Sequence, residues 1–429
     1  MIARWRWALG QMTKRLWFRA TLFSLIGVIT ALLAIVFRDF VPPSLPAKIG
    51  ADSVDKILGI IASSMLAVTT FSLSTMVSAY SAASSGVTPR ATSLVMEDST
   101  TQNALATFIG SFLFSLVGII ALSTGAYGAQ GRVVLFAVTL LMILLIVYTL
   151  LRWIDHLSKL GRVGETIDRV ESATLTALER RARWPFLGGA PYPSGYTPPL
   201  EASTVVSTGT GYIQHIDVSA LAALARQHAL EIYLEVLPGS FVHLGAPIAR
   251  LVRADGAQAV EDELDTRLES QVLDAITLGV RRTFDQDPRF GLSVLAEIAS
   301  RALSPATNDS GTVIDVIGRG VRCFTTWSTE LPETDDLDPD CLRVHIRCIE
   351  VHDLFDDFFT LIARDGAGLL EIDIRMLKAL ISLAEIDPGL FAEQCRWHAA
   401  LLLKRADKAL TLEEEKARLH TLARPLMTP

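Results

Sequence analysis

The chain has 429 residues, half of them hydrophobic, and a formal net charge of −7. Its charge is unevenly divided: residues 1–153 carry eleven Lys/Arg and five Asp/Glu, whereas residues 154–429 carry 28 Lys/Arg and 41 Asp/Glu. A basic, apolar front joined to an acidic remainder predicts a membrane domain followed by a soluble domain. The acidic balance argues against nucleic acid as a partner, because binding a phosphate backbone needs clustered Lys and Arg.

Four uncharged apolar runs in the first third of the chain predict four transmembrane helices. A helix needs about 20 apolar residues to cross the hydrocarbon core of a bilayer. The runs cover residues 20–37, 57–89, 99–131 and 133–151, and each is bounded by charged residues. We therefore expect a four-helix transmembrane domain over residues 1–153 that is embedded in the lipid bilayer.

Basic residues lie just outside both ends of this predicted domain. Five of them precede the first run, and a second group follows the fourth run, namely Arg152, Lys159 and Arg162. Because cytoplasmic flanks of membrane helices carry an excess of Lys and Arg, both termini are predicted to be cytoplasmic. The large C-terminal part is then a cytoplasmic domain.

The second apolar run is dense in hydroxyl side chains. At about 100° per residue, Ser63, Thr70, Ser74 and Ser81 fall within about 40° of one another, and Ser78 lies close by. Two interpretations are open. Small and hydroxyl side chains pack membrane helices together, or this stripe lines a polar path shared by several subunits, because four helices alone enclose little space.

Charged residues are missing from all four runs, which hold no Asp, Glu, Lys, Arg or His. Such residues mark proton relays and ion-coupled transport. The sequence therefore argues against a proton-coupled pump.

Beyond the membrane runs, we expect a helical extension and linker over 154–199, with one helix from 154 to 183, and a β-rich module over 200–256. The pattern GYIQHID…LPGSFVHLGAPIARL within this module resembles a barrel-sandwich hybrid of the biotinyl or lipoyl kind. No lysine occurs between Lys159 and Lys378. Because a carrier domain needs a modified lysine, we expect no covalent cofactor.

Residues 257–429 are predicted to be mainly helical. Helices are expected at 261–278, 290–303 and about 312–327, with two or three more between 352 and 420 that break at Asp365-Gly366 and Asp387-Pro388-Gly389. The turn before the third of these helices supplies N-cap residues. Its turn or ligand candidates are Ser304, Asn308 and Asp309.

Catalytic and metal-binding motifs are not found in the sequence. It has no GxSxG, no HExxH, no Walker loop and no GxGxxG after a predicted strand. The four cysteines form no CxxC pair and have no zinc-site spacing, and we interpret them as reduced thiols; they are Cys323, Cys341, Cys348 and Cys395. We expect no enzymatic activity, no metal and no cofactor.

Three stretches carry a resemblance to a known family: the hydroxyl-rich second run, GYIQHID…PGSFVHLGAPIARL, and RALSPATND at Arg301–Asp309. Together they resemble the bacterial family known as domain of unknown function 2254. The resemblance covers most of the chain and implies a multi-pass protein of the bacterial inner (plasma) membrane. It implies no particular activity.

The fold class expected is an α-helical membrane domain with four transmembrane helices plus an α+β cytoplasmic domain with a small barrel-sandwich-like β module. Our leading hypothesis is a homo-oligomeric channel or passive pore for ions or small solutes, with a cytoplasmic domain that assembles or gates it. The alternative is a non-conducting membrane-anchored sensor or scaffold whose cytoplasmic domain binds a ligand or a protein. The predicted pore-lining residues are Ser63, Thr70, Ser74, Ser78 and Ser81.

Overall fold

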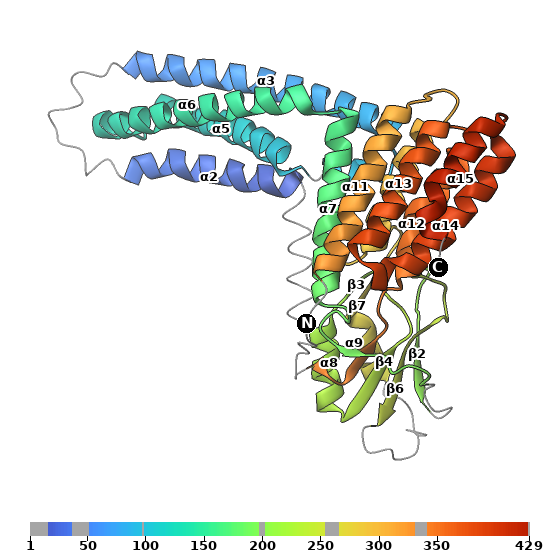
Figure 1. Cartoon of the computed structure of the whole chain (residues 1–429). Coiled ribbons are helices and arrows are strands. Elements are labelled where there is room, and N and C mark those ends of the chain that lie inside the picture. The colour runs from blue at the N-terminus through green and yellow to red at the C-terminus, as the bar shows by residue number, and fades with distance from the viewer. Residues whose placement is uncertain are drawn as a thin grey trace. The chain divides into compact units, whose positions relative to one another are not determined.

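The computed structural model describes residues 16–36, 51–96, 98–196, 202–253, 266–330 and 341–427. The chain divides into two compact units, one formed by Arg6–Thr166 and one that contains Ile167–Pro429. We call them the membrane unit and the α/β unit. The blue to teal helices labelled α2, α3, α5 and α6 in Figure 1 belong to the first, and the strands and the orange to red helices belong to the second.

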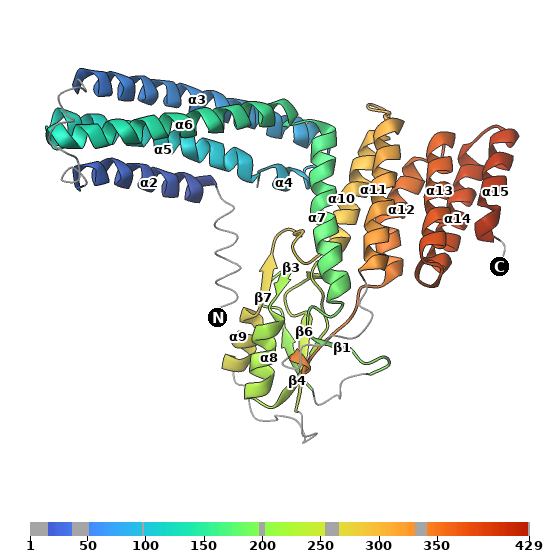
Figure 2. The ribbon, with the colours of Figure 1, turned by 60° about the vertical axis from the view of Figure 1, so that its left-hand side comes forward.

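The membrane unit is built around one central helix. Its described helices are α2 (Leu16–Val36), α3 (Ala51–Gly86), α4 (Thr92–Met96), α5 (Ser99–Ser123) and α6 (Gly128–Lys159). Helix α5 packs against α2, α3 and α6, which run alongside it in Figures 1 and 2. Asp98 starts α5 by accepting hydrogen bonds from the backbone N–H groups of Thr100 and Thr101. The rings of Phe108 and Phe114, both in α5, are fully buried in the bundle.

Three helices in the described residues are long and apolar enough to cross a membrane: Ser53–Ala82, Thr92–Ser123 and Gln130–Lys159. The four transmembrane helices expected from the sequence are therefore not confirmed. The first expected span falls on α2, whose apolar stretch Trp17–Leu33 is shorter than the about 20 residues that a span needs. The remainder of that run, from residue 37, lies outside the described residues.

The single helix predicted over residues 154–183 is wrong, because the chain turns between α6 and α7 (Val163–Arg183). Gly161 lies in this turn with φ +82°, a left-handed conformation that favours glycine. A side chain at this position would also lie 3.3 Å from the backbone of Ala79. The helical periodicity continues through the turn, so the pattern alone hides the break.

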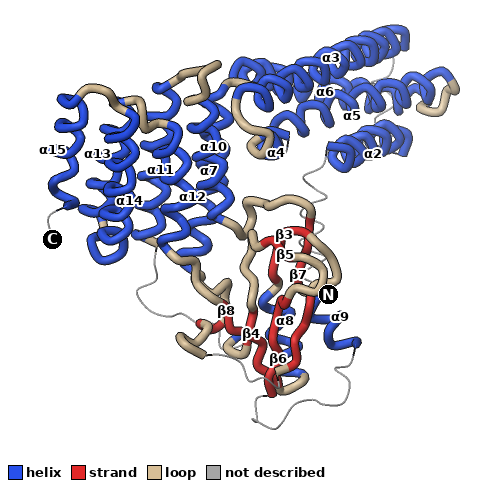
Figure 3. Tube along the Cα trace, turned by 90° about the vertical axis from the view of Figure 1, so that its right-hand side faces the viewer, coloured by secondary structure: helices blue, strands red, loops and turns tan. Residues whose placement is uncertain are grey.

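The described residues of the α/β unit form two sheets. The five-stranded sheet has the order β1-β8-β4-β6-β2, with β1, β8 and β4 parallel and β4, β6 and β2 antiparallel. The three-stranded sheet has the antiparallel order β5-β3-β7. Figure 3 shows the strands in red. Their bounds are β1 Ala190–Pro191, β2 Ser203–Val206, β3 Gly211–Ile216, β4 Leu230–Leu234, β5 Phe241–Val242, β6 Pro247–Arg253, β7 Ile276–Gly279 and β8 Val344–Ile346.

The barrel-sandwich module expected over residues 200–256 is not confirmed. Strands β7 and β8 come from outside that range and pair with β3 and β4 inside it, and β1 extends the larger sheet by pairing with β8. The local pattern therefore does not form a closed module. Helix α8 (Val218–Gln227) lies within the same range and packs against β4 and β8. The helix predicted over Glu261–Leu278 is corrected: α9 covers Thr266–Asp274, and β7 follows because its residues pair with β3.

Six helices form the remaining part of the α/β unit. They are α10 (Pro288–Ala302), α11 (Ser310–Thr329), α12 (Val351–Asp365), α13 (Leu370–Ile386), α14 (Pro388–Ala409) and α15 (Glu413–Met427). Helices α10, α12 and α14 pack in one row and α11, α13 and α15 in a second, and the succession is visible in Figure 2. Buried rings fill the space between the rows, among them Phe324, Phe355 and Phe359.

Most helices of this region agree with the sequence predictions. The helices expected at 290–303 and about 312–327 are confirmed as α10 and α11, and the two expected breaks separate α12, α13 and α14. Four helices, rather than the expected two or three, follow residue 350.

Candidate functional site

The five predicted pore-lining residues lie together on the outward face of α3. All five are exposed, whereas residues on the opposite side of the helix, including Leu58, Met65 and Met76, are buried. At about 100° per residue, the centre of the surface formed by these five residues lies roughly 180° from the centre of the buried side. We call this surface the hydroxyl face; its members are Ser63, Thr70, Ser74, Ser78 and Ser81.

Hydroxyl groups of this face donate their protons to carbonyls of their own helix. Ser63 Oγ lies 3.0 Å from the carbonyl oxygen of Gly59, Thr70 Oγ1 lies 2.9 Å from that of Leu66, and Ser78 Oγ lies 3.1 Å from that of Ser74. A hydroxyl oxygen that donates in this way keeps its lone pairs as acceptors. The face can therefore offer oxygen atoms to water, to a cation or to a donor on another helix.

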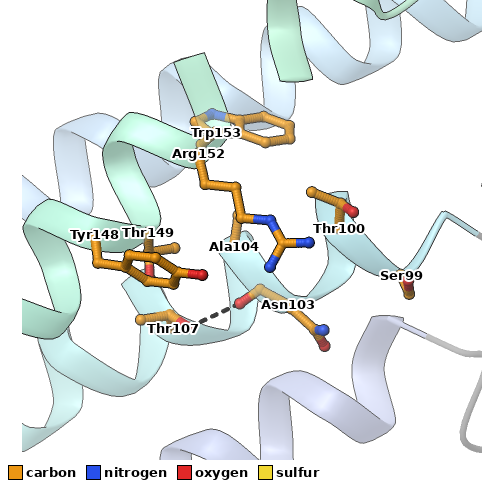
Figure 4. Close-up of a pocket in the computed structure, with 9 residues that line it drawn as sticks. All are labelled: Ser99, Thr100, Asn103, Ala104, Thr107, Tyr148, Thr149, Arg152 and Trp153. Carbon is orange, nitrogen blue, oxygen red and sulfur yellow. Dashed lines mark hydrogen bonds between the residues drawn. The ribbon is translucent and has the colours of Figure 1, made fainter. Parts of the chain in front are cut away.

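A second polar surface of the membrane unit is a pocket of about 160 Å³ between α5 and α6. Figure 4 shows Arg152 extending from α6 toward Thr100 and Asn103 of α5. Arg19 of α2 donates to Asn103 Oδ1 over 2.7 Å, so three helices meet at this end of the bundle. The side chain of Arg152 is exposed.

Beside this pocket lies a hydrogen-bonded cluster that the sequence did not reveal. His156 Nε2 is 2.6 Å from Asp98 Oδ2 and 3.1 Å from Thr101 Oγ1. Trp153 stacks on His156 and donates from its indole N–H to Ser72 Oγ over 2.9 Å. The cluster joins α3, α5 and α6. Its sequence signals are weak: an Asp directly before one apolar run and a His just after another.

Comparison with known proteins decides the family. The family model described as predicted membrane protein, domain of unknown function 2254, matches residues 13–382. The chain belongs to this family. Together with the three long apolar helices, membership indicates that the protein resides in a membrane.

Curated relatives of this family member are uncharacterized. Over 241 residues the chain is 28% identical to the uncharacterized protein Mb1321c of Mycobacterium bovis and equally to the uncharacterized protein Rv1290c of Mycobacterium tuberculosis. Each match covers 55% of this chain and 45% of the relative, so less than half of the relatives' length is represented. No solved structure matches the chain.

The turn that carries the domain of unknown function 2254 resemblance is a helix cap in this structure. Asp309 is the N-cap of α11, with Oδ1 3.0 Å from the backbone N of Thr312 and Oδ2 2.6 Å from Thr312 Oγ1. These hydrogen bonds lower the pKa of Asp309. Asn308 has φ +47°, and the carbonyl of Ser304 accepts from the backbone N–H groups of Thr307 and Asn308.

The two sets of candidate residues therefore belong to different units. The hydroxyl face lies on α3 of the membrane unit, and Ser304, Asn308 and Asp309 close a turn of the α/β unit. The hydrogen bonds of that turn are local and structural. Among the residues that the structure describes, no group of three His, Cys, Asp or Glu side chains is placed to hold a metal ion.

Proposed function

We propose that this protein is a subunit of a homo-oligomeric membrane channel or passive pore that α3 lines. The observation that carries the proposal is the outward position of the hydroxyl face on a helix long enough to span a membrane. Within one copy of the chain, the described residues leave that face exposed. Several copies that share it would enclose a path lined with hydroxyl oxygens.

The chemistry of the face favours weak, passive interaction with a solute. The hydroxyls have no charge, and α3 carries no Asp, Glu, Lys, Arg or His between Lys56 and its end at Gly86. Proton donation to the helix carbonyls leaves acceptor oxygens on the surface. Conduction requires such weak, repeated binding, because a solute that binds tightly does not leave.

The competing explanation is helix packing between subunits without conduction. Hydroxyl and small residues let membrane helices approach closely and hydrogen-bond to one another. Both explanations require an oligomer, so the oligomeric state alone does not separate them. A steric block within the path does.

The test is ion flux from liposomes that contain the purified full chain or a Thr70→Trp variant. Leu73→Trp is the matched control, because Leu73 lies one turn along the same helix, is 45% exposed and points about 95° away from the centre of the hydroxyl face. We expect flux in the parent and in Leu73→Trp and loss of flux in Thr70→Trp, with the same oligomeric state in all three proteins.

Equal flux in Thr70→Trp and the parent contradicts the pore wall assigned to α3. Absence of flux in the folded, oligomeric parent across several monovalent and divalent ions favours the second candidate, a membrane-anchored sensor or scaffold. A specific observation supports that candidate: a cavity of the α/β unit lined by three arginines.

A further inference from the structure

The α/β unit contains a cavity of about 160 Å³ whose charged wall residues are all arginines. Its walls come from the end of α7, the turn between β4 and β5, and the chain from the end of β7 to the start of α10. Ile349, just before α12, completes them. The lining residues are Arg181, Leu237, Pro238, Gly239, Ser240, Arg282, Gln286, Arg289 and Ile349. On the same measure of volume, a cavity needs about 10–15 Å³ to hold one water molecule, so this cavity has room for a small polar molecule.

Arg181 is the unusual residue of this wall, because its side chain is buried and two of its nitrogen atoms have no hydrogen-bond partner among the described residues. The residue is 2% exposed. Its Nη2 donates to the carbonyl oxygen of Arg347 over 3.2 Å, while Nε and Nη1 have no hydrogen-bond partner among the described residues. Burying a charge without full pairing is costly. Burial lowers the pKa of Arg181 to about 10, so the guanidinium is still charged at neutral pH.

The other two arginines of the wall already have carboxylate partners. Arg282 binds Asp287 through two hydrogen bonds of 2.7 and 3.0 Å. Arg289 binds Asp357 at 2.6 Å and Asp353 at 2.7 Å. None of these three carboxylates lines the cavity. Among the ion pairs of the described residues, Arg181 has none, although the charge of Asp287 acts on it from nearby. Arg181 therefore lines the cavity without a carboxylate bound to it.

The turn at Pro238-Gly239 places further polar groups at the cavity. Ser240 Oγ accepts a hydrogen bond from the backbone N–H of Leu237 over 3.1 Å, which leaves its own proton to donate. Gly239 has φ +94°, and a Cβ there would lie 2.3 Å from Asp287 Oδ2. Glycine therefore keeps this turn packed against the Asp287–Arg282 pair.

We propose that this cavity is a binding site for a small oxyanion of the phosphate kind, held by Arg181 with the Ser240 hydroxyl. An oxyanion would supply the directly bound anionic partner that Arg181 lacks among the described residues and would accept hydrogen bonds from its unmatched N–H groups. Charge-assisted hydrogen bonds of this type are strong. The inference concerns binding alone. It holds whether or not the protein conducts, so a failure of the flux experiment leaves it intact.

The test measures binding of inorganic phosphate to the full chain in detergent micelles by isothermal titration calorimetry, with chloride at equal ionic strength as reference. We expect one phosphate per chain. Arg181→Met should weaken binding by about tenfold or more, which corresponds to about 1.4 kcal/mol or more. Arg183→Met is the matched control, because Arg183 lies two residues along α7, is exposed and pairs with Glu330; its phosphate affinity should equal that of the parent.

A measurement on the parent alone covers the case in which Arg181→Met does not fold. Hydrogen–deuterium exchange with and without phosphate should show slower exchange confined to the segments around Leu237–Ser240 and 281–289. Absence of saturable phosphate binding, protection only at other segments, or a folded Arg181→Met variant with unchanged affinity each overturns the proposal.

Discussion

Asp373 of α13 should make the stability of the α/β unit depend on pH in an unusual direction. Its side chain is fully buried, and neither carboxyl oxygen has a hydrogen-bond partner in the part of the chain that the structure describes. Burial, with a smaller effect of the Glu371 charge, raises the pKa of Asp373 from 3.8 to about 7. The pKa rises because burial removes the ionised carboxylate from water and no partner replaces the water.

The sign follows from proton binding. Between pH 4 and pH 7 the folded state keeps a proton on Asp373 that the unfolded state has lost, so stability falls as pH rises through this window and is level above it. At about 1.4 kcal/mol for each pH unit between the two pKa values, the cost is roughly 1.5 kcal/mol at pH 5 and roughly 4 kcal/mol at pH 8. The difference between these two conditions is roughly 2–3 kcal/mol.

The assay is thermal unfolding of the full chain in detergent micelles at pH 5 and pH 8, for the parent and for Asp373→Asn. The neutral amide does not titrate, so its burial cost is the same at both pH values. We expect the midpoint of Asp373→Asn, relative to the parent, to rise by roughly 5–10 °C between pH 5 and pH 8. Glu414→Gln, at an exposed position of α15, should show no such difference. An equal offset at both pH values would refute the reasoning.

Two further predictions concern helices of the same unit. Asp309→Ala removes the N-cap of α11 and should lower stability by about 1 kcal/mol in chemical denaturation, with phosphate affinity and ion flux unchanged; loss of either function in a folded variant would assign the turn a functional role. Gly320→Ala should cost about 1–3 kcal/mol, because the new methyl group would lie 2.1 Å from the Phe358 ring. Gly318→Ala, in the same helix but facing only the tip of a flexible arginine, should be neutral or slightly stabilising, and an equal loss in both variants would contradict the packing argument.

Local signals explain which elements the sequence could predict. Helices α10 and α11 begin at Asp287 and Asp309, whose side chains cap the first turn, and such caps are readable from neighbouring residues. Strand β7 is not readable in this way, because its pairing with β3 joins residues about 60 positions apart and overrides the helical periodicity before it. The same holds for β8, whose partners β1 and β4 lie far away in the chain.

The candidate sites differ in the same way. The hydroxyl face follows from spacing along one helix, so its membership could be predicted, although which side of α3 packs against α5 and α6 required the structure. In sequence, Arg181 is one of three arginines in the last turn of the charged helix α7, and nothing nearby distinguishes it from Arg180 or Arg183. Arg181 is buried beside Arg347 and the β4–β5 turn, which are distant from it in the sequence. No local sequence pattern predicts this burial.

Helix α7 joins the membrane unit to the rest of the α/β unit along the chain. Along the chain it follows α6 after the turn at Gly161, and its last turn carries Arg181. An anion bound at Arg181 can influence the membrane unit only if it binds more tightly to one conformation of this helix than to another. Coupling of this kind is reciprocal: if phosphate changes the equilibrium between conducting and closed states by some factor, that transition changes phosphate affinity by the same factor. A difference in phosphate affinity between Thr70→Trp and Leu73→Trp would therefore demonstrate coupling even where flux is blocked. Equal affinity in the two variants would show that the cavity and the hydroxyl face act independently.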